Sequence, residues 1–229
     1  INAGVEQGEM CVIQGTSGSG KSTLLNCIGG LDTVDSGSIV VDGQEVAGLN
    51  SKALSNYRRE KLGFIFQFYN LVPNLTVKEN IQVCQYLTKN PLNMEELLQV
   101  LGLTEHQNKF PAQLSGGQQQ RVGIAAALVT SPRLIIADEP TTALDSITQR
   151  QIVDLLASLV DDSGASMLFI THDFAVLNHA TTRCYVLADG RVAESGQTAD
   201  ILQSPHTKVA SQLVTSARAL SLRIDAETK

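Results

Sequence analysis

The sequence contains no tryptophan, and aromatic residues make up only 4% of its 229 residues. Binding sites that stack the bases of single-stranded nucleic acid need exposed aromatic rings, so this scarcity argues against such a site. Basic residues are also in deficit, because 17 lysines and arginines stand against 23 acidic residues, a net charge of −6. Non-specific binding to nucleic acid requires a basic footprint. We therefore expect no nucleic-acid partner.

Cysteine is equally sparse, and the four cysteines lie far apart at Cys11, Cys27, Cys84 and Cys184. Without a close pair such as C-x-x-C, the pattern predicts buried, reduced thiols and no zinc site. No apolar run approaches the roughly 18–20 residues that span a bilayer. With a hydrophobic fraction of 43% and a charged fraction of 17%, the composition indicates a globular chain without a membrane span.

The pattern of apolar residues predicts a mixed α/β fold. Short apolar runs that end in polar turns are typical of strands buried in a parallel sheet, and Asp-Gly pairs after such runs indicate hairpins. The predicted buried strands are Met10–Ile13, Leu134–Ala137 and Met167–Ile170, and the predicted hairpins follow Ser38–Val41 and Cys184–Leu187. Helices are expected at Ser22–Cys27, Met94–Leu101, Gln118–Leu128 and Ser146–Val160, with a last helix from about Lys208. Residues from about 71 to 128 therefore read as a helical insert in a strand–helix core.

A glycine-rich loop follows the first predicted strand and opens a helix. It matches G-x-x-x-x-G-K-[ST] at every fixed position. The glycines let backbone N–H groups turn toward an anion, and the helix behind the loop adds the positive end of its dipole. Lys21 would place a charge at the β- and γ-phosphates, and the Ser22 hydroxyl could bind Mg²⁺. The predicted nucleotide-phosphate site comprises Gly15, Thr16, Ser17, Gly18, Ser19, Gly20, Lys21, Ser22 and Thr23.

A second predicted strand, Leu134–Ala137, ends in the acidic pair Asp138 and Glu139. In P-loop ATPases the first acid of such a pair holds Mg²⁺ opposite the loop hydroxyl. The second acid can accept a proton from the attacking water. Together with the glycine-rich loop, the pair predicts Asp138 as a metal ligand and Glu139 as a general base.

The segment Leu114-Ser115-Gly116-Gly117-Gln118 lies just ahead of a predicted helix, and Gln118 precedes Asp138 by 20 residues. Its serine and glycines can form a second anion cradle at a helix N-terminus. With these three motifs, the sequence resembles the nucleotide-binding domain of ABC (ATP-binding cassette) ATPases from about Gly4 to Gln197. The resemblance implies one P-loop NTPase (RecA-like) domain over residues 1–229. Its parts would be an α/β core at 1–70 and 129–200, an antiparallel β lobe near Gly37–Val46, a helical lobe at 71–128 and a C-terminal tail at 201–229.

The resemblance also assigns roles to residues that carry no signal alone. Gln67 resembles the Q-loop glutamine, which senses the metal and the attacking water and is expected to be both catalytic and metal-binding. His172 resembles the switch histidine at the γ-phosphate, and Asp145 resembles the acid of the loop that leads from the acidic pair toward a dimer partner. In the family, the signature motif covers the γ-phosphate held by a second chain; here that motif comprises Ser115, Gly116, Gly117 and Gln118.

By this resemblance the chain binds ATP and Mg²⁺ and hydrolyses ATP as one of two cassettes, identical or different, that sandwich two nucleotides. It would power an ABC transporter as a cytoplasmic subunit, held at the inner face of the cell membrane by an integral membrane permease. Residues 63–81 are similar to the bacterial lipoprotein-releasing and macrolide-exporting ATPases. Within them, Phe68–Leu75 would receive a coupling helix of the permease.

The sequence departs from the family pattern in the helix after the signature motif and in the residues before the loop. Ala126 stands where the family usually has an arginine, and Gly123 costs that helix up to about 1 kcal/mol relative to alanine. No aromatic residue precedes Gly15 that could stack on adenine, and we expect the full-length protein to begin further upstream. The remaining histidines match no motif and are expected to be solvated; they are His106, His179 and His206.

Two other functions fit part of the pattern. A soluble ABC ATPase, such as one for Fe–S cluster assembly, would carry the same motifs; co-purification with membrane proteins would distinguish a transporter subunit from it. A small-molecule P-loop kinase would not need Leu114–Gln118, and it would form a phosphorylated metabolite in place of free phosphate.

Overall fold

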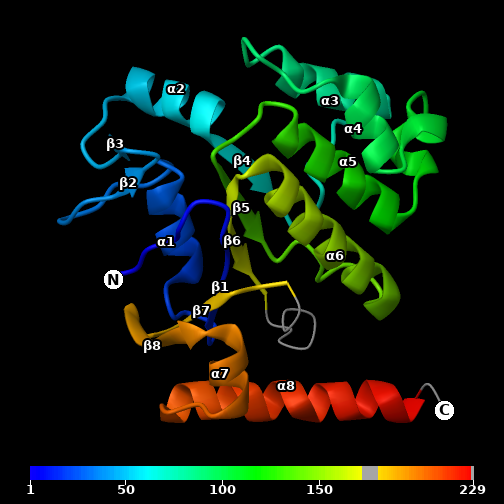
Figure 1. Cartoon of the computed structure of the whole chain (residues 1–229). Coiled ribbons are helices and arrows are strands. Elements are labelled where there is room, and N and C mark those ends of the chain that lie inside the picture. The colour runs from blue at the N-terminus through cyan, green and yellow to red at the C-terminus, as the bar shows by residue number, and fades with distance from the viewer. Residues whose placement is uncertain (172–179, 228–229) are drawn as a thin grey trace.

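A six-stranded sheet, ordered β4-β5-β6-β1-β7-β8, forms the centre of the molecule (Figure 1). The structure is a computed structural model that describes the backbone of residues 1–171 and 180–227 and the side chains of residues 1–171 and 180–217. The first five strands in this order pair in parallel, and the edge strand β8 is antiparallel to β7. The strands are β1 (Met10–Gly15), β4 (Leu62–Ile65), β5 (Leu134–Asp138), β6 (Ser166–Ile170), β7 (Arg183–Ala188) and β8 (Arg191–Gln197); β2 (Val40–Val41) and β3 (Gln44–Glu45) form a separate hairpin.

Helices cover both faces of the sheet because successive strand residues point to opposite faces. Cys11 and Ile13 of β1 belong to the core that α1 and α2 close, whereas Val12 between them belongs to the core on the other face. Helices α3 to α8 contribute to that second core. The helices are α1 (Lys21–Ile28), α2 (Ser51–Lys61), α3 (Val77–Gln85), α4 (Met94–Val100), α5 (Gly116–Leu128), α6 (Ser146–Ser163), α7 (Thr198–Gln203) and α8 (Lys208–Glu227), with short 3₁₀ turns at Thr104–His106 and Pro111–Gln113.

The predicted α/β fold is confirmed, and the predicted buried strands and helices all form, with ends within three residues of those expected. Strand β4 and the helices α2, α3 and α7 were not predicted individually from the sequence. The three apolar residues of β4 are interrupted by Gly63, where a Cβ would lie 2.7 Å from the carbonyl oxygen of Ala127 in α5. The glycine that hides β4 in the sequence therefore lets the strand and α5 approach each other closely.

Both predicted Asp-Gly turns form in the structure. Asp42 and Gly43 have φ values of 48° and 74°, and Asp189 and Gly190 have values of 48° and 72°. Positive φ at both central residues is the geometry of a type I′ turn, whose twist matches that of the strands it joins. The first turn closes the β2–β3 hairpin, and the second reverses the chain from β7 into β8.

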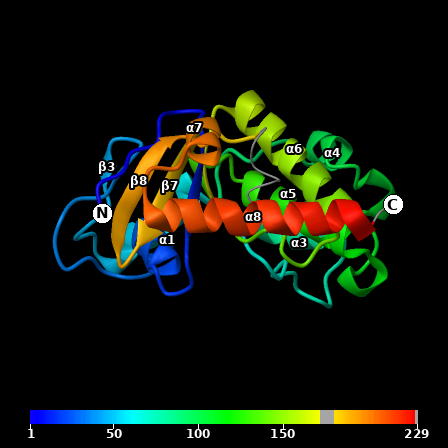
Figure 2. The same ribbon diagram turned by 90° about the horizontal axis from the view of Figure 1, so that it is seen from below.

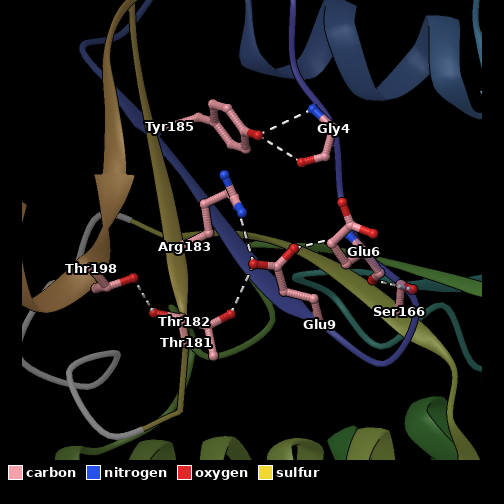
Figure 3. A network of polar contacts seen from close by, with 9 residues as sticks. All are labelled: Gly4, Glu6, Glu9, Ser166, Thr181, Thr182, Arg183, Tyr185 and Thr198. Atoms are coloured by element: carbon pink, nitrogen blue, oxygen red, sulfur yellow. Dashed lines mark hydrogen bonds and ion pairs between the residues drawn. The ribbon is translucent and has the colours of Figure 1, made fainter.

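Polar contacts fasten the first nine residues to β6 and β7 (Figure 3). The Tyr185 hydroxyl donates to the Gly4 carbonyl oxygen at 2.6 Å and accepts from the Gly4 N–H at 3.1 Å. The Glu9 carboxylate accepts from Arg183 Nε and from the Thr182 hydroxyl, both at 3.1 Å. Burial raises the pKa of Glu9, but these hydrogen bonds and one from the Glu6 N–H outweigh burial and lower it. The N-terminal residues are thus held against the sheet.

The helices that follow β8 close one side of the molecule. α7 packs on β8, and α8 runs beneath the sheet beside β1, β7 and β8 (Figures 1 and 2). The Glu194 carboxylate of β8 accepts from the N–H groups of His206 and Thr207 at 2.9 and 2.8 Å, directly before α8 begins. Within the described ranges, no helix is long and apolar enough to cross a bilayer.

Candidate functional site

The carboxyl ends of the parallel strands β4, β5, β6 and β1 lie at one edge of the sheet. Gln67 follows β4, Asp138 and Glu139 end β5, and the glycine-rich loop follows β1. Open α/β sheets bind ligands at this edge. β6 runs between β1 and β5, so Thr171 at its end lies between the loop and the acidic pair. His172 falls outside the described residues.

The glycine-rich loop is closely packed at its start and open at its crest. A Cβ at Gly15 would lie 2.5 Å from the carbonyl oxygen of Leu187 in β7 and 2.5 Å from Ser19 Oγ. Only glycine fits this position without a shift of the loop. Thr16 and Ser17 at the crest are exposed, as are Ser22 and Thr23 in the first turn of α1 behind the loop. A Cβ at Gly15 would therefore displace the start of the loop from β7.

The Lys21 ammonium is held inside the loop, with the residue only 8% exposed. Its Nζ donates to the carbonyl oxygens of Gly15 at 2.8 Å and Thr16 at 3.0 Å. Burial lowers the pKa of Lys21, while the charges of Glu139 and Asp138 raise it by a smaller amount. The two carboxylates therefore lie within electrostatic reach of the loop lysine, as the sequence motifs predicted.

Glu139 adopts a backbone conformation that is unusual for a residue with a side chain. Its φ is 48°, in the left-handed region that costs non-glycine residues free energy. The Glu139 N–H donates to the carbonyl oxygen of Ile170 in β6 at 2.9 Å, and its Oε2 accepts from the Thr142 hydroxyl at 3.2 Å. These contacts fix the carboxylate at the sheet edge, beside Thr171.

The signature motif forms the capped N-terminus of α5. The Ser115 hydroxyl accepts from the Gln118 N–H at 3.3 Å, and Gln118 Oε1 accepts from the Ser115 N–H at 2.9 Å, a capping box. Because Oε1 faces the Ser115 N–H, Gln118 Nε2 is left to donate to His106 Nε2, 2.9 Å away. The expectation that His106 is solvated is wrong, because His106 is half-buried and hydrogen-bonded to Gln118. His206 is exposed as expected, and His179 lies outside the described residues.

The signature motif is displaced sideways from the loop of its own chain. α5 packs on the edge strand β4, and β5 and β6 separate β4 from β1. At the usual strand spacing of about 4.8 Å, β4 and β1 lie about 14 Å apart. Within one chain, the signature motif and the glycine-rich loop thus lie apart.

Asp145 caps α6. Its carboxylate accepts from the Thr148 N–H at 3.1 Å and from the Thr148 hydroxyl at 2.7 Å, and these bonds lower its pKa. A Cβ at Gly117 would lie 2.6 Å from the Thr148 methyl group. Asp145 and the signature motif therefore both contact Thr148. No sequence pattern pointed to this threonine.

A cavity of about 850 Å³ lies beside α1, between it, the β2–β3 hairpin and the N-terminal residues. Thr23 and Leu24 of α1 line it, and Tyr185 is its only aromatic lining residue among those described. The Tyr185 ring is buried, and its hydroxyl is bonded to Gly4. Among the described residues that line this cavity, none therefore exposes an aromatic ring.

A family model described as "ABC transporter" matches residues 1–142, more than half of the chain. The chain belongs to the ABC transporter family. The family resemblance drawn from the loop, the acidic pair and the signature motif is confirmed, and with it the P-loop fold of the cassette. The narrower similarity of residues 63–81 to lipoprotein-releasing and macrolide-exporting ATPases stays a prediction.

Curated relatives extend this result along the whole cassette. The methionine import ATP-binding protein MetN of Caulobacter vibrioides is 41% identical over 222 residues, which cover 95% of this chain and 67% of the relative. A putative ABC transporter ATP-binding protein of Mycoplasma pneumoniae, the MG065 homolog, is 45% identical over 80% of this chain and 40% of its own length. The chain spans about two thirds or less of the length of these relatives.

Solved structures agree with the cassette fold. The ATP-binding cassette MJ0796, as a dimer in a post-hydrolysis state bound to ADP and Pi, is 39% identical with a TM-score of 0.76. The similarity covers 86% of this chain and 89% of that chain. A second dimeric structure of MJ0796, described as a bacterial ABC transporter cassette, is 40% identical with a TM-score of 0.75.

Proposed function

We propose that this chain binds and hydrolyses ATP as one of two cassettes that drive an ABC transporter. The observation that carries the proposal is the meeting of the glycine-rich loop with Asp138 and Glu139 at one sheet edge, within electrostatic reach of Lys21. A loop cation and paired carboxylates at the end of parallel strands match the needs of phosphoryl transfer, in which catalysis is mostly positioning and charge stabilisation.

The loop binds the phosphates of ATP. Its crest is exposed at Thr16 and Ser17, and α1 begins directly behind it with the positive end of its dipole. Lys21 exchanges the carbonyl oxygens of Gly15 and Thr16 for phosphate oxygens, which form stronger, charge-assisted hydrogen bonds. Because those carbonyls already hold the ammonium at the loop, binding requires little reorganisation of Lys21.

The residues around Lys21 fit a bound Mg²⁺. Ser22 exposes a hydroxyl at the start of α1, Asp138 ends β5, and Gln67 follows β4 at the same sheet edge. Hydroxyl, carboxylate and amide oxygens are the ligands that Mg²⁺ prefers. When bound, the ion neutralises charge on the β- and γ-phosphates. We assign Ser22, Asp138 and Gln67 to this site.

Glu139 acts as the general base. It takes a proton from a water whose oxygen bonds to the γ-phosphorus, while the bond from that phosphorus to the bridging oxygen breaks and its electron pair leaves with ADP. The bonds from Thr142 and to Ile170 orient the carboxylate for this role. By the family resemblance, His172 contacts the γ-phosphate.

The signature motif serves the nucleotide of a second cassette, which is another copy of this chain or a related one. The separation of α5 from β1 by two intervening strands supports this assignment, since Ser115–Gln118 does not lie over its own loop. The dimeric MJ0796 structures support it further, because they are cassettes of the same fold in paired form. Asp145 belongs to the same dimer-facing side, through its contact with Thr148 behind Gly117.

The membrane partner is an integral permease, which holds the cassette at the cytoplasmic face of the membrane. Phe68 is 73% exposed and Val72 is 44% exposed, in the segment Phe68–Leu75 that follows Gln67. Exposed apolar side chains grouped in one loop suit contact with a helix of a partner. The relatives named for methionine import favour an importer over an exporter. Co-purification with an integral membrane protein in mild detergent tests this assignment against a soluble ABC ATPase.

Replacing Glu139 by glutamine tests the enzymatic part. With Mg²⁺ the unchanged chain should release phosphate from ATP, and Glu139→Gln should bind ATP, accumulate as a dimer and lose turnover by roughly 100-fold or more. Glu105→Gln, at an exposed glutamate of the helical lobe, is the matched control and should keep normal turnover. Normal turnover by Glu139→Gln would show that the base is wrongly assigned, and no ATP binding by the unchanged chain would overturn the proposal.

A further inference from the structure

Residues 66–69, which include Gln67, lie against one face of α5. Contacts at helix positions 116, 120 and 123 define this face, because residues four and seven apart in a helix lie above one another. In the middle of the face, Gln120 Nε2 donates to the carbonyl oxygen of Phe66 at 3.4 Å, and Gln120 is fully buried. The contacts at both ends of the face are made by Tyr69.

Tyr69 approaches α5 at two glycines. A Cβ at Gly116 would lie 2.9 Å from the Tyr69 hydroxyl oxygen, and a Cβ at Gly123 would lie 3.2 Å from the Tyr69 carbonyl oxygen. The ring therefore covers the first turn of α5, which carries the signature motif, while the backbone covers the middle of the helix. Burial at this contact raises the pKa of the Tyr69 phenol. Gly123, which weakens the helix by itself, is what allows the approach.

The chain bends sharply to make this contact. Both Tyr69 and Asn70 have φ values of 49°, in the left-handed region that residues with a Cβ adopt at a cost in free energy. The Asn70 N–H donates to the carbonyl oxygen of Phe68 across the bend. Two successive residues stay in this conformation only where their surroundings hold them. For Tyr69, that surrounding element is α5.

We propose that Tyr69 is a positioning residue that fixes the signature motif relative to Gln67. Its ring and backbone both press on α5, so Gln67 and Ser115–Gln118 move as one unit. The inference rests on the proposed function, in which Gln67 serves the nucleotide of its own chain and the signature motif serves that of the partner. Tyr69 then couples the two nucleotide sites of the dimer. A permease that contacts the exposed Phe68 beside it would shift Gln67 and the signature motif together.

The test compares dimerisation with nucleotide binding in the Glu139→Gln background. At saturating ATP, adding Tyr69→Ala should weaken the dimer by roughly tenfold, equivalent to about 1.4 kcal/mol. Binding of ATP to the dilute monomer should stay within about twofold, because Tyr69 packs against α5, which lies apart from the glycine-rich loop. Tyr69→Phe keeps the ring and should keep the dimer. Tyr86→Ala, at a tyrosine 83% exposed, is the matched control and should change neither quantity.

Gly123→Ala separates positioning from stability. Alanine favours the helix more than glycine does, so the midpoint of thermal unfolding should stay or rise. The added Cβ would push the Tyr69 carbonyl away from a 3.2 Å contact, so ATP-dependent dimerisation should weaken several-fold. A substitution that only disturbed folding would lower the unfolding midpoint as well.

Two results would overturn the inference. One is a Tyr69→Ala dimer as tight as its parent; the other is a loss of monomer ATP binding as large as the loss of dimerisation. If Tyr69→Ala does not fold, Gly123→Ala decides, since an unchanged dimer in that variant contradicts the coupling. Failure of the Glu139→Gln parent to dimerise with ATP would contradict the proposed function and not the role of Tyr69.

Discussion

The substitution Gly15→Ala tests the packing that shapes the glycine-rich loop. In the structure its Cβ would lie 2.5 Å from the carbonyl oxygen of Leu187, which belongs to β7 and is paired with the loop strand. Ordinary contact begins at about 3.4 Å, so the start of the loop must move by about 0.9 Å. The second close atom, Ser19 Oγ, can rotate away, but the strand carbonyl cannot.

A movement of this size acts mainly on nucleotide binding. Overpacking of this kind costs about 1–3 kcal/mol of stability, which a protein of ordinary stability survives folded. Hydrogen bonds tolerate only a few tenths of an ångström of stretching, and one bond to a charged group contributes about 1.5–3 kcal/mol. Losing one bond to phosphate would raise the Kd for ATP by roughly 10- to 150-fold.

Equilibrium titration with ATP, together with thermal unfolding of the same samples, measures both effects. Gly4→Ala is the matched control, because a Cβ there meets nothing within 4 Å and the bonds of Gly4 to Tyr185 use only backbone atoms. The control should bind ATP normally. If Gly15→Ala binds ATP within about twofold of the unchanged chain, the close approach of Leu187 does not shape the loop and the reasoning fails.

The remaining predictions concern contacts outside the loop. His106→Phe removes the acceptor for Gln118 Nε2 and should weaken ATP-dependent dimerisation by about 0.5–1.5 kcal/mol. His106→Gln, whose Oε1 can accept, should restore dimerisation. Equal dimerisation by both variants would show that this hydrogen bond contributes nothing to the dimer. Burial raises the pKa of Glu194, but bonds from the His206 and Thr207 N–H groups outweigh it and lower the pKa. The stability that Glu194 contributes is therefore complete above the ordinary glutamate pKa of about 4.3 and is lost as pH falls through the lower folded-state pKa. As the pH is lowered from about 6 to 3, the midpoint of thermal unfolding should fall more steeply for the unchanged chain than for Glu194→Gln. Parallel curves of this midpoint against pH would contradict the prediction.

Features that depend on neighbours in sequence were predictable. The apolar run before Gly15, the fixed glycines and Lys21 identify the strand, loop and helix because loop geometry and helix dipole act over a few residues. The two Asp-Gly turns were predictable for the same reason, since positive φ is a local preference. β4 was not, because a four-residue apolar run with a glycine resembles many segments that are not strands.

His106 and Tyr69 could not be found from the sequence. Each contacts α5 from a segment that precedes the helix, and neither belongs to a pattern of fixed spacing. The signal for Tyr69 was present only indirectly, as Gly123 inside a helix where alanine would be more stable. A glycine that weakens its own helix often marks a close approach of another segment, but the sequence does not say which segment.

By itself, then, the sequence determined the family, the phosphate loop, the acidic pair and the signature motif, because each is a short segment whose chemistry follows from adjacent residues. Only the tertiary structure decided that the phosphate loop and the acidic pair share a sheet edge, since the order β4-β5-β6-β1 is set by pairing between strands far apart in the chain. The tertiary structure also decided that α5 lies apart from the glycine-rich loop of the same chain and that it packs against Tyr69. Those relations depend on packing between distant residues, which no local pattern of the sequence specifies.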